Sequence, residues 1–436
     1  MDNKLEKDGN VYNGDAGSRI YPGRRHFAAM AACYGMGVFN DSFFRQATML
    51  LAVGAGIGWY QGTAMALFAL PYLVLSAPAG WLADRYPKRR VVIGAKALEV
   101  MAMICGALGV LTGSWILMLA MVSLMGSQSA IFNPALNGSI PELFPLGRVN
   151  PVNANLRVAA TGAILLGIAC AGVALDVGGG DNPGGGRLLV AIVVLIVALG
   201  GFATAFGVPH RDAADPDDPF PWTGSWDTIK DLWEIRRDPF LTLAIGMIAL
   251  VFFLGALKVI IVNEMGKDQF GLGDAATSGM IFAAMSGVAI GGLLSTPIVK
   301  RRPWHSLMWP LGAAIAAVFC VIVLSPLMPG AVQLPVIFLM LGIAGVIGGL
   351  MVIPSQAFVQ VKPDPERRGA VIAACNFAVF SGILISGPLG GAVLRVLSPS
   401  SAFAVLAGIS LCVVLALTWR THRRTCEVDI VGDNNE

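Results

Sequence analysis

The residues of this sequence that could do chemistry are ionisable side chains set inside long apolar stretches. They are Asp41, Arg45, Lys96, Glu99, Arg157 and Lys258. A charge inside a membrane helix is costly, so such residues bind a charged solute, relay a proton or pair with one another. The pattern therefore predicts a polar site within a bilayer, and the question becomes which of these charges belong to it.

Asp41 and Arg45 are four residues apart, so they share one face of a helix. Asn40, Ser42 and Gln46 lie beside them. One interpretation is a self-neutralising ion pair that only holds helices together. We favour the other, a polar notch in the wall of a central cavity, because this many polar residues exceed what one ion pair needs.

Lys258 is the only charge within the apolar stretch 240–263. A lysine at mid-span needs a carboxylate, a phosphate or water, and Asp41 is the natural carboxylate. The alternative is that its amino group snorkels to the nearer interface. Lys96 and Glu99, three residues apart, either line the site or pair with nearby arginines. Arg157 either lines the site or anchors its helix at the level of the lipid phosphates.

The composition places these charges in an integral membrane protein. Of 436 residues, 56% are hydrophobic and 13% charged, whereas soluble proteins carry about a quarter charged residues. A membrane span needs roughly 20 apolar residues. Twelve stretches qualify: 27–53, 59–82, 91–112, 115–138, 152–175, 188–207, 240–263, 275–299, 305–326, 333–358, 368–394 and 401–419.

The basic residues predict the topology of these twelve spans. Of 30 Lys and Arg, 23 fall on the side of the N-terminus, three on the other side and four inside spans. Basic loops stay in the cytoplasm. We therefore expect an even number of spans with both termini cytoplasmic.

The chain is expected to divide into two six-helix bundles joined by a linker. The linker begins with the acidic, proline-rich run 210–219 and continues into 222–237, which can form an amphipathic helix on the membrane surface. His210 and Asp215 fit the H-x-x-x-x-D pattern of glycerolipid acyltransferases, but nothing around them predicts a scaffold that would hold a catalytic His. The expected units are a disordered cytoplasmic tail 1–26, the bundles 27–207 and 240–420, the linker 208–239 and a cytoplasmic tail 421–436.

The loop between the second and third spans is short and highly charged. It holds Gly80, Asp84, Arg85 and Arg89 in the run Gly80–Arg90. Small residues let helices approach closely, and an aspartate can cap the next helix or pair with an arginine. The run resembles the signature loop of the major facilitator superfamily, G-x-L-x-D-R-x-x-(K/R)-(K/R). Most members carry Gly where this chain has Pro87. The resemblance implies a conformational gating role for these four residues.

The first span is similar to that of the lysophospholipid transporter family within this superfamily. The run 40–47, Asn-Asp-Ser-Phe-Phe-Arg-Gln-Ala, corresponds to the common form N-D-N-F-F-K-N-A. The likeness continues through 66–91, 126–134, 141–143 and 152–154, and in the second half through Lys258, 349–354 and Asn376. That family moves lysophospholipids across the bacterial inner membrane for a cytoplasmic acyltransferase. The resemblance implies that Asp41 works with Lys258, which replaces the usual arginine.

Two positions depart from the pattern of the family. Its lysine in the fourth span falls on Leu136, and its glutamate in the fifth falls on Arg157. The number of cationic side chains expected in the cavity is unchanged, but one of them lies on the fifth span instead of the fourth. This change affects the expected substrate more than the expected fold. Asn137, beside Leu136, and Arg157 complete the set of candidate substrate-binding residues.

Taken together, these features predict an all-α integral membrane protein of twelve helices in two pseudo-symmetric bundles, located in the bacterial inner membrane. The expected function is transport of a lysophospholipid or similar amphiphile by alternating access. A proton-coupled transporter of a small organic solute or drug, with Asp41 titrating, is the first alternative. The second alternative is a membrane sensor that does not transport. A long folded soluble extension would be the sequence feature that favours it. We expect a monomer with no cofactor, no resident metal, no enzymatic activity and no nucleic-acid partner.

Overall fold

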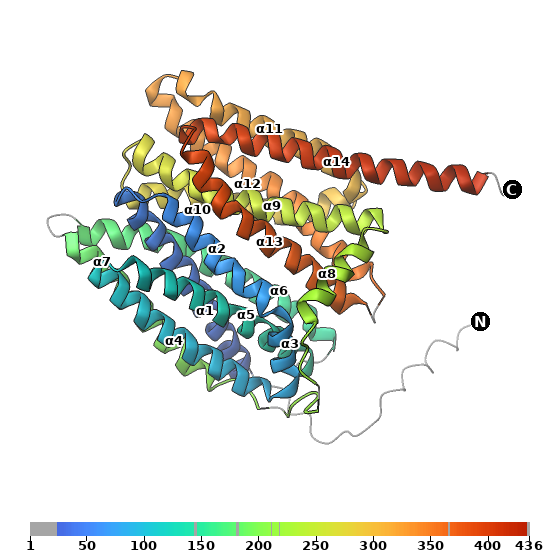
Figure 1. Cartoon of the computed structure of the whole chain (residues 1–436), viewed down its shortest axis with the longest axis horizontal. Helices are drawn as coiled ribbons and strands as arrows, with labels where there is room; N and C mark the ends of the chain where they lie inside the picture. The colour runs from blue at the N-terminus through green and yellow to red at the C-terminus, as the bar shows by residue number, and fades with distance from the viewer. Residues whose placement is uncertain are drawn as a thin grey trace.

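The computed structural model describes residues 24–143, 146–179, 183–210, 212–217, 219–364 and 367–433. Within these ranges the chain forms helices and connecting turns, without a β-strand. Figure 1 shows the helices as two groups, blue to green for the first half of the chain and yellow to red for the second. The N-terminal tail expected at 1–26 lies almost entirely outside the described residues.

The described part of the first half holds seven helices, two of which are parts of one bent segment. They are α1 Arg24–Gly54, α2 Trp59–Val74, α3 Ser76–Arg85, α4 Lys88–Thr112, α5 Trp115–Leu143, α6 Leu146–Gly179 and α7 Pro183–Ala205. The pair α2–α3 is bent by 51°. Pro78 accounts for the break, because it offers no N–H to the carbonyl four residues earlier and its ring crowds that carbonyl.

The second half contains six long helices that follow a linker helix. The linker helix is α8 Gly224–Ile235, and the long helices are α9 Pro239–Glu264, α10 Asp274–Val299, α11 Met308–Val323, α12 Gly330–Val361, α13 Arg368–Leu394 and α14 Pro399–Asp433. A short π-helix, Met265–Gln269, continues α9. Because α14 runs on to Asp433, residues 421–433 of the expected C-terminal tail are helical (Figure 1).

Each expected span coincides with a helix, or with the bent pair for 59–82. Within the described part of the chain, ten helices are long and apolar enough to cross a membrane, and the bent pair makes eleven. The remaining segment is α1, whose polar residues between Asn40 and Gln46 lower its hydropathy. The all-α membrane fold is confirmed. Helix α1 is the expected span that does not meet the criterion of length and hydropathy for a membrane helix.

Each half has an apolar core of its own, a small cluster of buried residues from α1, α2 and α9 joins them, and the halves meet along two helix pairs. Two clusters of buried residues draw only on α1–α7 and the turn after α7, and another only on α8, α9, α12 and α13. Helix α2 packs along α13, and α6 packs along α10. At the first contact, a Cβ on Gly62 would strike the carbonyl of Gly387, and one on Gly387 would strike the carbonyl of Gly62. Only glycine permits this approach.

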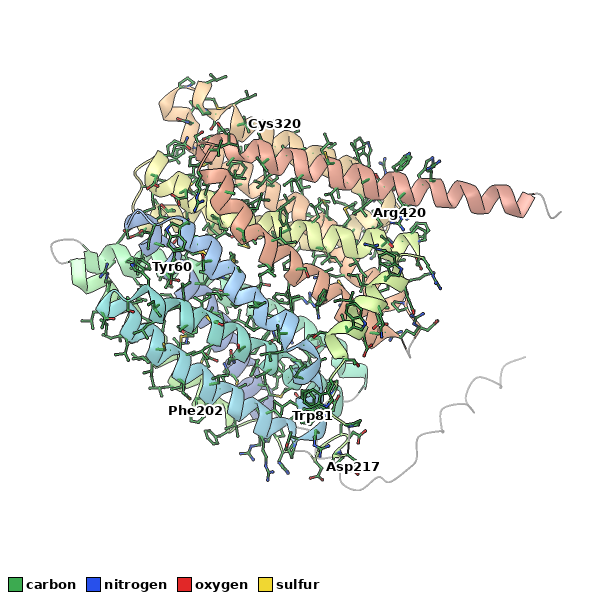
Figure 2. All side chains as sticks on the ribbon, viewed as in Figure 1. Tyr60, Trp81, Phe202, Asp217, Cys320 and Arg420 are labelled. Carbon is green, nitrogen blue, oxygen red and sulfur yellow. The ribbon has the colours of Figure 1, made fainter. Side chains whose placement is uncertain are left out.

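The helices define two ends of the molecule. We call the end that carries the Arg85–Lys88 turn and α8 the basic end, and the end that carries the Gly54–Trp59 turn and the π-helix the opposite end. In Figure 2, Trp81, Asp217 and Arg420 lie toward the basic end and Tyr60 toward the opposite end.

Candidate functional site

Asp41 lies on α1 and points toward α5. Its Oδ2 accepts a hydrogen bond of 2.6 Å from Ser129 Oγ. Its Oδ1 is buried without a hydrogen-bond partner among the described residues. A buried carboxylate oxygen that lacks a partner is costly. Asp41 therefore keeps one oxygen available for a ligand, a proton or water, which is what a transport site needs.

Arg45 and Asn40 leave α1 in other directions. The guanidinium of Arg45 stacks over the Phe68 ring of α2, with 4.9 Å between Cζ and the ring centroid. No ion pair within 4 Å joins it to Asp41 in the described structure, so the self-neutralising interpretation is not supported. Asn40 is fully buried, and its Nδ2 donates to the Val194 carbonyl of α7 at 3.0 Å. Asn40 therefore ties α1 to α7 in this conformation.

Lys258 lies in the last third of α9, six residues before its end at Glu264, and is only 7% exposed. The described residues offer it no ion-pair or hydrogen-bond partner. The expected pair with Asp41 is thus absent from this conformation, in which Asp41 accepts a hydrogen bond from Ser129. Within the described residues, Asp41 in the first half and Lys258 in the second therefore both lack an oppositely charged partner.

Arg157 and Asn137 are both exposed, on α6 and α5. Arg157 Nη1 donates to Gln356 Oε1 of α12 at 3.1 Å, so it joins the two halves. Leu136, at the position of the family's lysine, is buried in the apolar cluster around α4 and α5. Arg157 is thus a contact between the halves near the basic end, whereas the Leu136 position is part of the core.

Lys96 and Glu99 form an ion pair at 2.6 Å with both side chains fully buried. The Lys96 amino group also lies 4.9 Å from the centroid of the Phe132 ring. They therefore pair with each other and not with the arginines of the basic loop. The pair is internal to the first half of the chain, between α4 and α5.

The basic loop departs from two expectations. A Cβ on Gly80 would meet open space, so its small size is not needed here for close packing, although Ala83 is buried. Asp84 is exposed, and α4, which begins at Lys88 with Pro87 as its N-cap residue, has no side-chain cap, so Asp84 does not cap it. The Asp84 carbonyl accepts the Asp215 N–H of the linker at 3.0 Å.

Arg85 and Arg89 of this loop bind within the first half. Arg85 stacks on the Trp81 ring with 5.6 Å between Cζ and centroid, and Arg89 Nη2 donates to the Phe206 carbonyl at 2.9 Å. The loop is therefore held to α3, the end of α7 and the linker in this conformation.

The halves also meet through side chains that sequence reasoning missed. Tyr72 of α2 stacks on Phe380 of α13, with 3.7 Å between ring centroids. Their signal, aromatic residues in apolar spans, is too common to single them out.

At the opposite end, four polar side chains form a chain of hydrogen bonds that alternates between the halves. Gln46 Nε2 donates to Asn263 Oδ1 at 3.0 Å, Asn263 Nδ2 to Gln61 Oε1 at 2.9 Å, and Gln61 Nε2 to Glu264 Oε1 at 3.2 Å. Gln46, Gln61 and Asn263 are buried. Amides inside apolar spans were the signal that could have identified them. This network closes the opposite end of the contact between the halves.

Known proteins with this architecture and sequence are transporters. The lysophospholipid transporter LplT of Escherichia coli O1:K1 is 24% identical over 409 residues, which cover 89% of this chain and 94% of that protein. LplT of Shigella sonnei matches to the same extent. Among solved structures, a bacterial homologue of the human lysosomal transporter Spinster, inward-facing and unoccupied, has a TM-score of 0.68 at 16% identity and covers 94% of this chain and 99% of that one.

A bacterial homologue of the iron transporter ferroportin, inward-facing, has a TM-score of 0.67 at 16% identity, over 92% of this chain and 98% of that one. At 16% identity, the solved structures support the fold and nothing further. A family model adds the sequence evidence, because the Major Facilitator Superfamily model matches residues 27–387, most of the chain. This chain belongs to the Major Facilitator Superfamily of membrane transporters.

Proposed function

We propose that this protein moves a lysophospholipid or a similar amphiphile across the bacterial inner membrane by alternating access. The observation that carries the proposal is that Asp41 in the first half has a buried Oδ1 without a hydrogen bond, and that Lys258 in the second half is buried, while neither forms an ion pair within the described residues. A headgroup with a phosphate and an ammonium offers a partner to both. The similarity to LplT supports the same class of substrate.

In this mechanism, residues 27–207 and 240–420 rock against each other about the site. Helices α1, α5, α9 and α12 line the cavity, and the acyl chain of the substrate lies along its apolar walls. Asp41, Arg45 and Lys258 contact the headgroup, with Asn40, Asn137 and Arg157 around them. Gly80, Asp84, Arg85 and Arg89 act at the basic end, which we place in the cytoplasm with both termini. A monomer suffices, and a cytoplasmic acyltransferase is the partner that would consume the product.

The closed opposite end supports an inward-facing assignment for the conformation described here. The amide network and the Gly62–Gly387 contact both join the halves at that end. At the basic end, Arg157 donates only one hydrogen bond to Gln356, and both α5 and α6 keep exposed polar side chains there. Such asymmetry is what alternating access requires of each of its two end states.

The test is uptake of labelled lysophospholipid by spheroplasts and by proteoliposomes that contain the purified chain. Uptake should require the protein and be lost in Lys258→Met. Absence of uptake by folded wild-type protein, with several headgroups tried, would reject the lipid substrate.

A second candidate is proton-coupled transport of a small organic solute. It is favoured by the free oxygen of Asp41 and by Leu136 and Arg157, which replace a lysine and a glutamate of the lysophospholipid family. Solute uptake that acidifies the vesicle interior, and that stops in Asp41→Asn, would select this candidate over the first.

A further inference from the structure

Helix α10 lacks a cap of its own at the opposite end. Its N-cap residue is Gly273, which has no side chain, and no side-chain cap is made within its own half. The first N–H groups of a helix have no partner inside the helix, so a neighbouring acceptor must satisfy them. This feature distinguishes α10 from α9, where Asp238 caps its own helix by accepting from the N–H groups of Phe240 and Leu241.

The missing cap of α10 is supplied by the other half of the chain. Asp176, near the end of α6, accepts the Asp274 N–H on Oδ1 at 2.9 Å and the Ala275 N–H on Oδ2 at 2.8 Å. A carboxylate at a helix N-terminus is also favoured by the helix dipole. The glycine at position 273 is needed for this fit, because a Cβ there would lie 2.9 Å from Asp176 Oδ2.

The surroundings of this contact support its strength. The carboxylate of Asp274 is engaged by Lys267 Nζ at 2.7 Å, which offsets its repulsion of Asp176. One turn earlier on α6, Gly172 allows close packing, because a Cβ there would strike the Asp274 carbonyl and lie 2.6 Å from Ser278 Oγ. Ser278 Oγ in turn lies 3.4 Å from Gln46 Nε2 of the amide network. The cap and the network thus act on the same end of α10.

We propose that Asp176 is a latch that holds the opposite end closed by capping α10 across the two halves. The inference rests on the proposed alternating access, since the cap must break when α6 and α10 separate at this end. Opening leaves two N–H groups of α10 without a protein acceptor, so the cap biases the equilibrium toward the closed opposite end. Because the cap is polar and partly exposed, water can replace it, which makes the latch reversible.

The latch is tested by measuring the distance across the opposite end, without any substrate. Spin labels at Ile116→Cys and Val396→Cys, both highly exposed at this end, report the separation in nanodiscs after the native cysteines are replaced by alanine. Wild type should give mainly the short distance. Loss of a capping side chain typically costs about 1 kcal/mol, so Asp176→Ala should raise the ratio of long to short distances roughly fivefold.

Asp238→Ala is the matched control, because it removes a carboxylate cap made within one half at the basic end. It should lower the melting temperature but leave the distance distribution at the opposite end unchanged. If Asp176→Ala does not fold, Asp176→Asn, which keeps a single acceptor oxygen, serves in its place with a smaller shift. An unchanged distribution in the folded Asp176 variant overturns the latch, and so does an equal shift in Asp238→Ala.

The same experiment separates the latch from the proposed substrate. A distance shift without lysophospholipid uptake would keep the latch and reject only the substrate. If the wild type and every variant gave one rigid short distance at the opposite end under every condition, with no second population, alternating access itself would be rejected. Gly172→Ala should shift the distance in the same direction as Asp176→Ala, because it forces α6 away from α10.

Discussion

Ser129 of α5 donates a 2.6 Å hydrogen bond to the carboxylate of Asp41 on α1, and no ion pair joins that carboxylate to Lys258 in the described part of the chain. The two charges therefore do not stabilise each other in the conformation described here. We expect Asp41→Asn and Lys258→Met each to abolish transport, since each removes one contact for the headgroup.

Their effects on stability should be independent. For residues that are not in contact, mutational changes in stability add to within about 0.5 kcal/mol. Thermal melts of the two single variants and the double variant measure this. A larger coupling energy would show that the two side chains meet and that our placement of the site is wrong.

Asp84 makes no side-chain contact that the described residues account for, although its carbonyl bonds the linker. If its carboxylate acts only when the basic end is closed, Asp84→Ala should leave the melting temperature unchanged and still cripple transport. Asp212→Ala, a fully exposed carboxylate in the nearby linker, is the control and should transport normally. Normal transport by Asp84→Ala would show that the loop only fixes the membrane topology and has no role in gating.

The Lys96–Glu99 pair is expected to matter for folding more than for transport. Both side chains are fully buried, and removal of one partner of such a pair costs roughly 3–5 kcal/mol because it leaves an uncompensated charge. Lys96→Met should therefore strongly lower the melting temperature, and Lys96→Met with Glu99→Leu should recover most of it. Failure of the double variant to recover stability would assign these residues a role other than mutual neutralisation.

The topology remains to be measured. The 23 basic residues expected on the N-terminal side predict that both termini are cytoplasmic. Reporter fusions after residue 436 and within 265–273 should lie in opposite compartments. Both reporters in one compartment would remove the twelve-span topology.

Hydropathy and charge were sufficient for the fold, because the bilayer demands long apolar helices and basic loops. They were also sufficient to single out Asp41, Lys258, Lys96 and Glu99, since charges in apolar spans are rare, but not to predict that Lys96 and Glu99 pair with each other. They were insufficient for Ser129, Gln61 and Asp176, whose roles depend on how distant helices rotate and cross. For Gly80 the sequence predicted a close helix contact that this conformation does not contain. A small residue in a signature motif therefore need not lie at a close contact in every conformation.

Helix α8 carries aromatic side chains on an exposed face. Trp226, Ile229 and Trp233 are spaced by three and four residues, so they share one face, and the two indoles are 61% and 69% exposed. On its inward face, Thr228 and Ile235 are buried. Arg236 stacks on Trp233, with 4.4 Å between Cζ and ring centroid, as suits a residue pair at the boundary between acyl chains and headgroups.

We therefore expect α8 to lie on the bilayer surface with Trp226 and Trp233 among the lipids. In nanodiscs made with brominated acyl chains, Trp226→Phe and Trp233→Phe should remove tryptophan emission that the lipid quenches strongly. Trp304→Phe is the control, because Trp304 packs against Phe358 with 4.9 Å between centroids, and the emission it removes should be quenched less. If aqueous iodide, and not the brominated lipid, quenches the emission of Trp226 and Trp233, α8 faces water, and its aromatic face must be explained by a protein partner.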